Sequence, residues 1–214
     1  MQSINRVAVL GCLLMTLLAG CSTTDSARPK PTQQAGEPPL EETAQLKKFR
    51  NSEHEQQAKL ANGEFNRALA LLRQNKLEEA YNAFSELNSK YPTLTGPIVN
   101  QAIILRKQGQ WQQAYDLLSQ SAKTHNTNPF LFNELGYISR KLGKFNEAQA
   151  SYQTAIGIDS TFANAHYNLA VLADLYLHQP ALALQEFETY QSLLDTPDKT
   201  VEVWIKELQR RVGE

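Results

Sequence analysis

The 214-residue sequence is short of cysteine and carries no excess of basic residues. Its two cysteines, Cys12 and Cys21, both lie near the N-terminus, which excludes a disulfide-stapled fold and a cysteine-rich zinc site. Lysine and arginine total 21 against 22 aspartates and glutamates, a formal charge of −1 that disfavours general binding to nucleic acid. The 42% hydrophobic and 20% charged residues are ordinary for a globular protein, and the length suits one domain or a small array.

Catalytic and metal-binding patterns are also missing from the sequence. The four histidines share no metal-ligand spacing and are interpreted as ordinary surface or groove residues: His54, His125, His166 and His178. No phosphate-binding loop, serine-nucleophile motif or zinc-protease motif occurs. The sequence therefore predicts no enzyme, cofactor, metal site or small-molecule substrate.

Residues 1–20 have the pattern of a secretory signal peptide. Arg6 is the only charged residue there, and an apolar run of about 13 residues follows it, shorter than the ~20 that span a bilayer. The run ends in Leu18-Ala19-Gly20-Cys21, which resembles the lipobox of bacterial lipoproteins. That resemblance implies removal of residues 1–20 and lipidation of Cys21 by a thioether-linked diacylglycerol and an acylated amine. Because residue 22 is serine rather than aspartate, it also implies the outer membrane, with the rest of the chain in the periplasm.

A linker is expected after the anchor. Residues 21–40 hold four of the nine prolines and little that is apolar, so this segment is expected to be a disordered tether of roughly 60 Å reach. Residues 41–60 permit a helix, with acidic residues at its start, and are expected to form an N-terminal helix before the next segment.

A period of 34 residues runs through residues 61–197. The eighth position of each unit is small, as a close approach of two helices requires: Ala68, Ala102, Gly136 and Ala170. The twentieth position is also small: Ala80, Ala114, Ala148 and Ala183. The twenty-fourth position is large and apolar: Phe84, Leu118, Tyr152 and Phe187. Position 15 of the first three units holds residues that tolerate a left-handed backbone: Asn75, Gly109 and Gly143.

This pattern resembles the tetratricopeptide repeat, a helix–turn–helix unit of 34 residues. The resemblance implies an all-α, right-handed superhelix with units at residues 61–94, 95–128, 129–162 and 163–197. Each unit is expected to form helices over positions 2–14 and 17–30, and the last unit needs one inserted residue near residues 177–179. The proline common at position 32 occurs only in the first unit, as Pro92.

Residues 198–214 are expected to form a capping helix. The apolar residues at spacings of three and four are Val201, Trp204, Ile205, Leu208 and Val212. The last unit of a solenoid needs a helix that covers its exposed face, so Trp204 is interpreted as a packing residue.

The resemblance also implies a concave groove lined by the first helix of each unit, suited to a peptide or helix of a protein partner. Its predicted lining is Phe65, Leu69, Arg73, Val99, Ile103, Arg106, Lys107, Phe130, Asn133, Tyr137, Arg140, Asn164, Tyr167 and Val171, with Asn66, Asn100 and Asn168 beside it. The fifth positions lack the lysine pattern of chaperone-type carboxylate clamps: Phe65, Val99, Asn133 and Tyr167. The basic residues of the second and third units favour an acidic segment as a hypothesis: Arg106, Lys107, Arg140 and Lys141.

The combined pattern predicts an outer-membrane lipoprotein that acts as a protein-binding adaptor. It resembles the tetratricopeptide lipoproteins of pilus and secretion assembly, of the type IV pilotin or tight-adherence kind. An alternative is a scaffold for cell-wall hydrolases or for an energy-transducing complex that spans the periplasm. A third hypothesis, an enzyme or ligand-binding receptor, lacks a catalytic constellation in the sequence.

Overall fold

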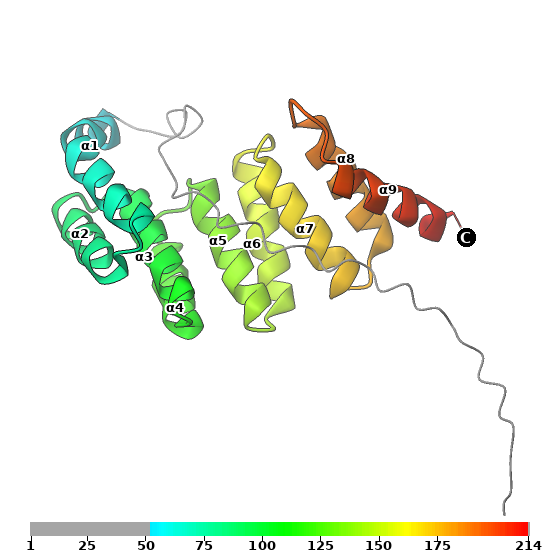
Figure 1. Cartoon of the computed structure of the whole chain (residues 1–214), viewed down its shortest axis with the longest axis horizontal. Helices are drawn as coiled ribbons and strands as arrows, with labels where there is room; N and C mark the ends of the chain where they lie inside the picture. The colour runs from blue at the N-terminus through cyan, green and yellow to red at the C-terminus, as the bar shows by residue number, and fades with distance from the viewer. Residues whose placement is uncertain (1–51, 214) are drawn as a thin grey trace, which may run out of the picture. The chain divides into compact units, whose positions relative to one another are not determined.

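The computed structural model describes residues 52–213, with side chains from Glu55 onward. The described residues lie in the compact unit Glu37–Glu214 and form nine helices without strands (Figure 1). The helices are α1 (Ser52–Arg73), α2 (Leu77–Lys90), α3 (Thr95–Lys107), α4 (Trp111–Ser121), α5 (Pro129–Lys141), α6 (Phe145–Ile158), α7 (Ala163–Leu175), α8 (Pro180–Ser192) and α9 (Lys199–Val212). The predicted signal peptide, the predicted lipidation site Cys21 and the predicted linker to residue 40 lie outside the described residues, as do residues 41–51 of the predicted N-terminal helix.

The helices form antiparallel pairs, in which each odd-numbered helix from α1 to α7 packs on the even-numbered helix that follows it. The pairs then stack, with α3 against α5 and α5 against α7. In the first three units the second helices begin at residues 77, 111 and 145, the seventeenth position in each case. The 34-residue period therefore predicts where these helices start.

The turns inside the pairs also follow the repeat. Asn75, Gly109 and Gly143 have φ values of 59°, 77° and 76°, so the prediction of a left-handed backbone at position 15 is confirmed. The turn between α7 and α8 holds residues 176–179, one more than the turn of residues 142–144, which confirms the inserted residue. His178 takes the left-handed conformation there, with φ of 55°, and Pro180 begins α8, where its missing amide hydrogen costs no hydrogen bond.

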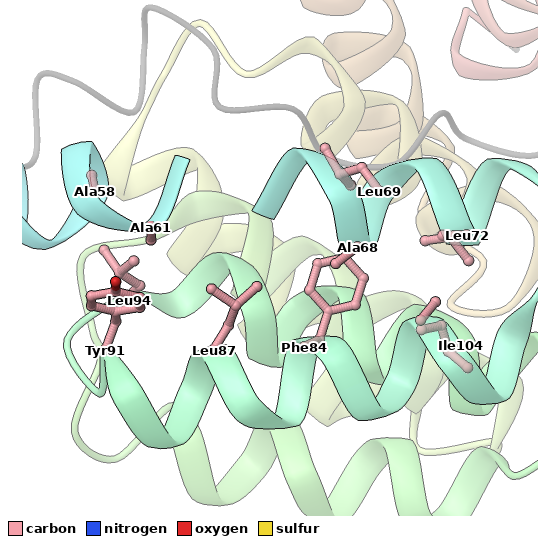
Figure 2. Close-up of a cluster of buried hydrophobic side chains, with 11 residues drawn as sticks. Ala58, Ala61, Ala68, Leu69, Leu72, Phe84, Leu87, Tyr91, Leu94 and Ile104 are labelled. Atoms are coloured by element: carbon pink, nitrogen blue, oxygen red, sulfur yellow. The ribbon is translucent and has the colours of Figure 1, made fainter. Parts of the chain in front are cut away.

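The first helix is longer than the repeat. α1 runs without a break through residue 60, so the predicted boundary between an N-terminal helix and the first unit does not separate two helices. Ala58 and Ala61 are buried beside Tyr91 and Leu94 at the far end of the first hydrophobic cluster (Figure 2). Burial of these side chains stabilises the extra turns of α1 on the second helix and the loop after it.

The small and large repeat positions meet in the helix–helix interfaces. The alanines at positions 8 and 20 are fully buried, and so are the large residues at position 24, which are at most 1% exposed. The third unit has the tightest of these contacts, because an added Cβ on Gly136 would lie 2.6 Å from the ring of Tyr152. Helices α5 and α6 thus touch through a position where only glycine fits in front of the tyrosine ring.

Helix α9 covers the last pair, as the sequence predicts for a capping helix. Asp198 caps its N-terminus by accepting hydrogen bonds from the backbone of Thr200 and Val201. Trp204 is buried and lies 5.4 Å from the ring of Phe187, which supports its interpretation as a packing residue. Val212, expected on the buried stripe, is instead 44% exposed because α9 ends there.

His166 is a buried residue, and its interpretation as a surface or groove histidine is wrong. Its Nδ1 lies 2.6 Å from Oε2 of Glu186 in α8, and its Nε2 lies 3.1 Å from the carbonyl oxygen of Ser160. Both partners accept hydrogen bonds, so the geometry favours the doubly protonated, charged imidazole. Burial lowers the pKa of His166, but the hydrogen bonds to Glu186 and Ser160 outweigh it, and the net shift is upward.

This pair predicts a pH-dependent stability. Because the folded-state pKa of His166 lies above its ordinary value of 6.5, the stabilisation is complete below about pH 6.5 and is lost as the pH rises through the folded-state pKa. We expect the free energy of unfolding, measured by urea denaturation, to fall between pH 6 and pH 9, and to fall less in Glu186→Gln. The exposed neighbour Glu188, changed to glutamine, serves as the control and should retain the wild-type dependence. The same pH dependence in Glu186→Gln and wild type would contradict this account.

Candidate functional site

The predicted groove residues divide into a buried and a solvent-accessible set. Six of them are at most 7% exposed and pack inside the array: Leu69, Val99, Ile103, Phe130, Asn133 and Val171. The accessible residues are Phe65, Arg73, Arg106, Lys107, Tyr137, Arg140, Asn164 and Tyr167. The contact of all these residues with a partner stays a prediction, and the accessible set gives the surface on which it can be tested.

Three cations surround one aromatic ring on this surface. The guanidinium carbons of Arg106 and Arg140 lie 5.0 and 5.2 Å from the ring centroid of Tyr137, and Nζ of Lys141 lies 5.7 Å from it. Arg106 comes from α3, and the other three residues come from the last two turns of α5. We name Arg106, Tyr137, Arg140 and Lys141 the Tyr137 cluster. The ring face attracts these positive charges and holds them close together on the surface.

One of the three cations is paired with a carboxylate. Arg106 donates through Nε to Oε1 of Glu134 in the next repeat, and the Glu134 side chain is only 4% exposed. This ion pair links α3 to α5 and compensates one positive charge of the cluster. Arg106 therefore belongs to the inter-repeat packing as well as to the surface.

Arg140 has a different environment, formed by tyrosines. Its guanidinium carbon lies 5.9 Å from the ring centroid of Tyr176, which is 40% exposed. Its Nε is buried without a hydrogen-bond partner in the described part of the chain. Tyr152 is a further neighbour, and burial raises the pKa of that phenol, so Tyr152 is neutral and adds no negative charge.

Sequence reasoning missed two of these residues. Glu134 lies at position 6 of the third unit, and its spacing of 28 residues from Arg106 is the signal that could have revealed the pair. Tyr176 follows the last residue of α7, outside the positions used to predict a groove, and its ring stacks 4.8 Å from that of Phe145. Two of the three asparagines expected beside the groove are buried and engaged within the array: Asn100 donates to the Gly96 carbonyl and Asn168 to Oδ1 of Asn133. The third, Asn66, is exposed and donates to Oδ1 of Asn62 in the same helix.

Residues 52–213 hold no group of three or more histidine, cysteine, aspartate or glutamate side chains arranged to bind a metal ion. None of the helices in this range combines the length and apolar character needed to cross a membrane. The Tyr137 cluster is the arrangement that we take as the candidate binding surface.

Family models match two parts of the array. A model for the tetratricopeptide repeat matches residues 64–93, and one for the TPR repeat matches residues 136–173. No curated protein matches the chain.

Several solved structures resemble the array at low sequence identity. PilF of Pseudomonas aeruginosa is 16% identical, with a TM-score of 0.64 over 73% of this chain and 71% of its own. MamA is 16% identical, with a TM-score of 0.57 over 68% of this chain and 84% of its own. The first TPR domain of Spaghetti (RPAP3), bound to the HSP90 peptide SRMEEVD, is 15% identical, with a TM-score of 0.50 over 55% and 91%. At these identities the likeness shows the fold alone.

The family models and these structures agree with the helix pairs and the period of the sequence. The chain thus contains tetratricopeptide repeats, and its described helices form an all-α tetratricopeptide superhelix.

Proposed function

We propose that this protein is a periplasm-facing adaptor, anchored by lipid at Cys21 to the outer membrane, that binds a protein partner and assists assembly of an envelope complex. A pilus or a secretion machine is the kind of complex that we have in mind. Tetratricopeptide arrays are typically protein-binding adaptors. The membrane anchor and the pilus or secretion role come from the lipobox-like Leu18-Ala19-Gly20-Cys21 and its combination with the repeats.

The observation that carries the binding role is the Tyr137 cluster. It combines an aromatic ring, which offers contact area at low entropy cost, with cations whose charge is only partly compensated by carboxylates of residues 55–213. Such a surface suits a polar or acidic segment of a protein better than a lipid tail or a nucleic acid. The peptide-bound Spaghetti domain supports a peptide as the form in which a partner binds.

Affinity purification tests this function. The full chain, tagged at its C-terminus, is recovered from detergent-solubilised membranes, and the proteins that accompany it are identified by mass spectrometry. We expect enrichment of a subunit of a pilus or secretion complex over an untagged control. Enrichment of cell-wall hydrolases or of an energy-transducing complex would support the alternative scaffold instead, and recovery of cytosolic proteins alone would contradict an envelope role.

A further inference from the structure

Position 12 of the repeat places one residue near the end of each first helix. In the four units these residues are Leu72, Arg106, Arg140 and Asp174. Two of the three charged ones have oppositely charged partners, because Arg106 pairs with Glu134 and Asp174 accepts from Arg211 of α9 at 2.8 Å. Arg140 has no ion pair with any carboxylate in residues 55–213.

The repeat register shows why Arg140 differs from Arg106. Glu134 lies 28 residues after Arg106, at position 6 of the next unit, and residue 168 stands at the same separation from Arg140. Residue 168 is asparagine, a neutral side chain whose amide already donates to Oδ1 of Asn133 at 2.9 Å. The interface between the third and fourth units therefore lacks the carboxylate that Glu134 supplies between the second and third.

The aromatic rings around Arg140 attract its positive charge without neutralising it. Tyr137 and Tyr176 lie within 5.2 and 5.9 Å of its guanidinium carbon, and aromatic faces attract a cation but carry no net charge. Arg140 is partly exposed, and a guanidinium carries five N–H donors, so a carboxylate can bind it although its Nε is buried. The exposed Lys141 adds a second positive charge on the same tyrosine ring.

We propose that Arg140 binds an acidic side chain, aspartate or glutamate, from a segment of the protein partner. The incoming carboxylate binds the partly exposed guanidinium of Arg140 and supplies the compensating charge that Glu134 supplies to Arg106, with Tyr137 and Tyr176 bordering it. This proposal rests on the proposed adaptor function and names the chemistry of the segment that the same surface binds.

Helix α3 adds a further positive charge beside α5, which favours a partner segment with more than one acidic residue. Lys107 ends α3 as Lys141 ends α5, and both are exposed. Packed helices lie about 8–10 Å apart, and a polyproline II segment advances about 3.1 Å per residue with three residues per turn, so acidic residues three apart would lie on one side and reach both ends. A run of aspartates or glutamates fits this spacing better than one terminal carboxylate does.

Peptide binding to the full chain, purified in detergent, tests the proposal. The probe is a short, end-capped, fluorescent peptide with glutamate at every third position, and the reference is the same peptide with glutamine. We expect the glutamate peptide to bind about tenfold more tightly in fluorescence anisotropy, and Arg140→Gln to remove that preference. Lys123→Gln removes one exposed positive charge in the segment between α4 and α5 and should leave the preference unchanged.

A second variant separates binding from folding. Asn168→Glu supplies the missing carboxylate within the chain and should also abolish the preference for glutamate, while Arg140 stays in place. Thermal unfolding of each variant shows whether it is folded at the temperature of the binding assay. If Arg140→Gln is unfolded there, the comparison of Asn168→Glu with wild type decides the question.

Several outcomes would overturn the proposal. Equal affinity of the wild type for the two peptides would do so, and so would a preference that survives in folded Arg140→Gln. Displacement of the glutamate peptide by millimolar inorganic phosphate, but not by acetate, would assign the site to phosphoryl groups instead. If Arg140→Gln captures an envelope partner as strongly as the wild type does, the adaptor function stands but Arg140 is not its binding site. If peptide binding depends on Arg140 but no envelope partner is recovered, the Arg140 site stands and the proposed adaptor function is contradicted.

Discussion

Replacement of Gly136 by valine is expected to lower the free energy of unfolding by about 3 kcal/mol, the upper part of the range for overpacked cores. A Cβ at this position would lie 2.6 Å from Cε1 and 2.7 Å from Cδ1 of Tyr152, both closer than carbon atoms can approach. The Tyr152 ring is fully buried between the helices of the third unit, so it has no open space into which to turn. Urea denaturation followed by circular dichroism measures the change.

Two further variants show whether the clash is the cause. Gly157 lies in the next helix with nothing within 4 Å of an added Cβ, so Gly157→Val should change the stability by no more than a few tenths of a kcal/mol. The pair Gly136→Ala with Tyr152→Leu reproduces Ala102 and Leu118 of the second unit and should recover most of the stability that Gly136→Ala loses. If the free energy of unfolding of Gly136→Val equals that of the wild type, α5 and α6 can move apart without loss of stability, and this account is contradicted.

Replacement of Cys21 by serine is expected to move the protein from the membrane fraction to the soluble periplasmic fraction. In the proposed function, acyl chains on Cys21 anchor the protein, and each buried methylene of such a chain contributes about 0.8 kcal/mol to membrane binding. A serine hydroxyl cannot form the thioether, so the anchor would be lost entirely. Cell fractionation and metabolic labelling with a radioactive fatty acid measure the two effects.

The second cysteine provides the matched control. Cys12 lies inside the predicted signal peptide and would be removed with it, so Cys12→Ser should leave labelling and membrane attachment unchanged. Membrane attachment of Cys21→Ser equal to that of the wild type would refute the lipid anchor. Such a result would leave the tetratricopeptide superhelix and the Arg140 site untouched.

The repeat positions explain how much of the fold is predictable. Small residues such as Ala80 and Ala114 recur because each helix pair repeats one close contact, so one register predicts the starts of α2, α4 and α6. The added length of α1 is not predictable in this way, because Ala58 and Ala61 pack on Tyr91 and Leu94 outside the repeated contact. A sequence period predicts the contacts that all units share, but it does not predict contacts found only at one end of the array.

The candidate site is less predictable, because its properties depend on pairs of residues from different units. Val99 and Ile103 occupy groove positions but are buried, since neighbouring helices close over them. Arg106 and Arg140 are equivalent in the register, and the residue 28 positions later and the neighbouring tyrosines distinguish them. His166 has no metal-ligand or catalytic spacing in the sequence, and its partner Glu186 lies 20 residues later, in the next helix.

Helix α9 has a consequence for how copies of this chain can associate. It lies on the face of α8 that the first helix of a fifth unit would otherwise occupy. Trp204 packs on Phe187, and Arg211 forms an ion pair with Asp174. A second molecule that approaches this end therefore meets the outer side of α9 and not the face of α8. The helix thus shields the apolar surface of the last pair from direct contact with another copy.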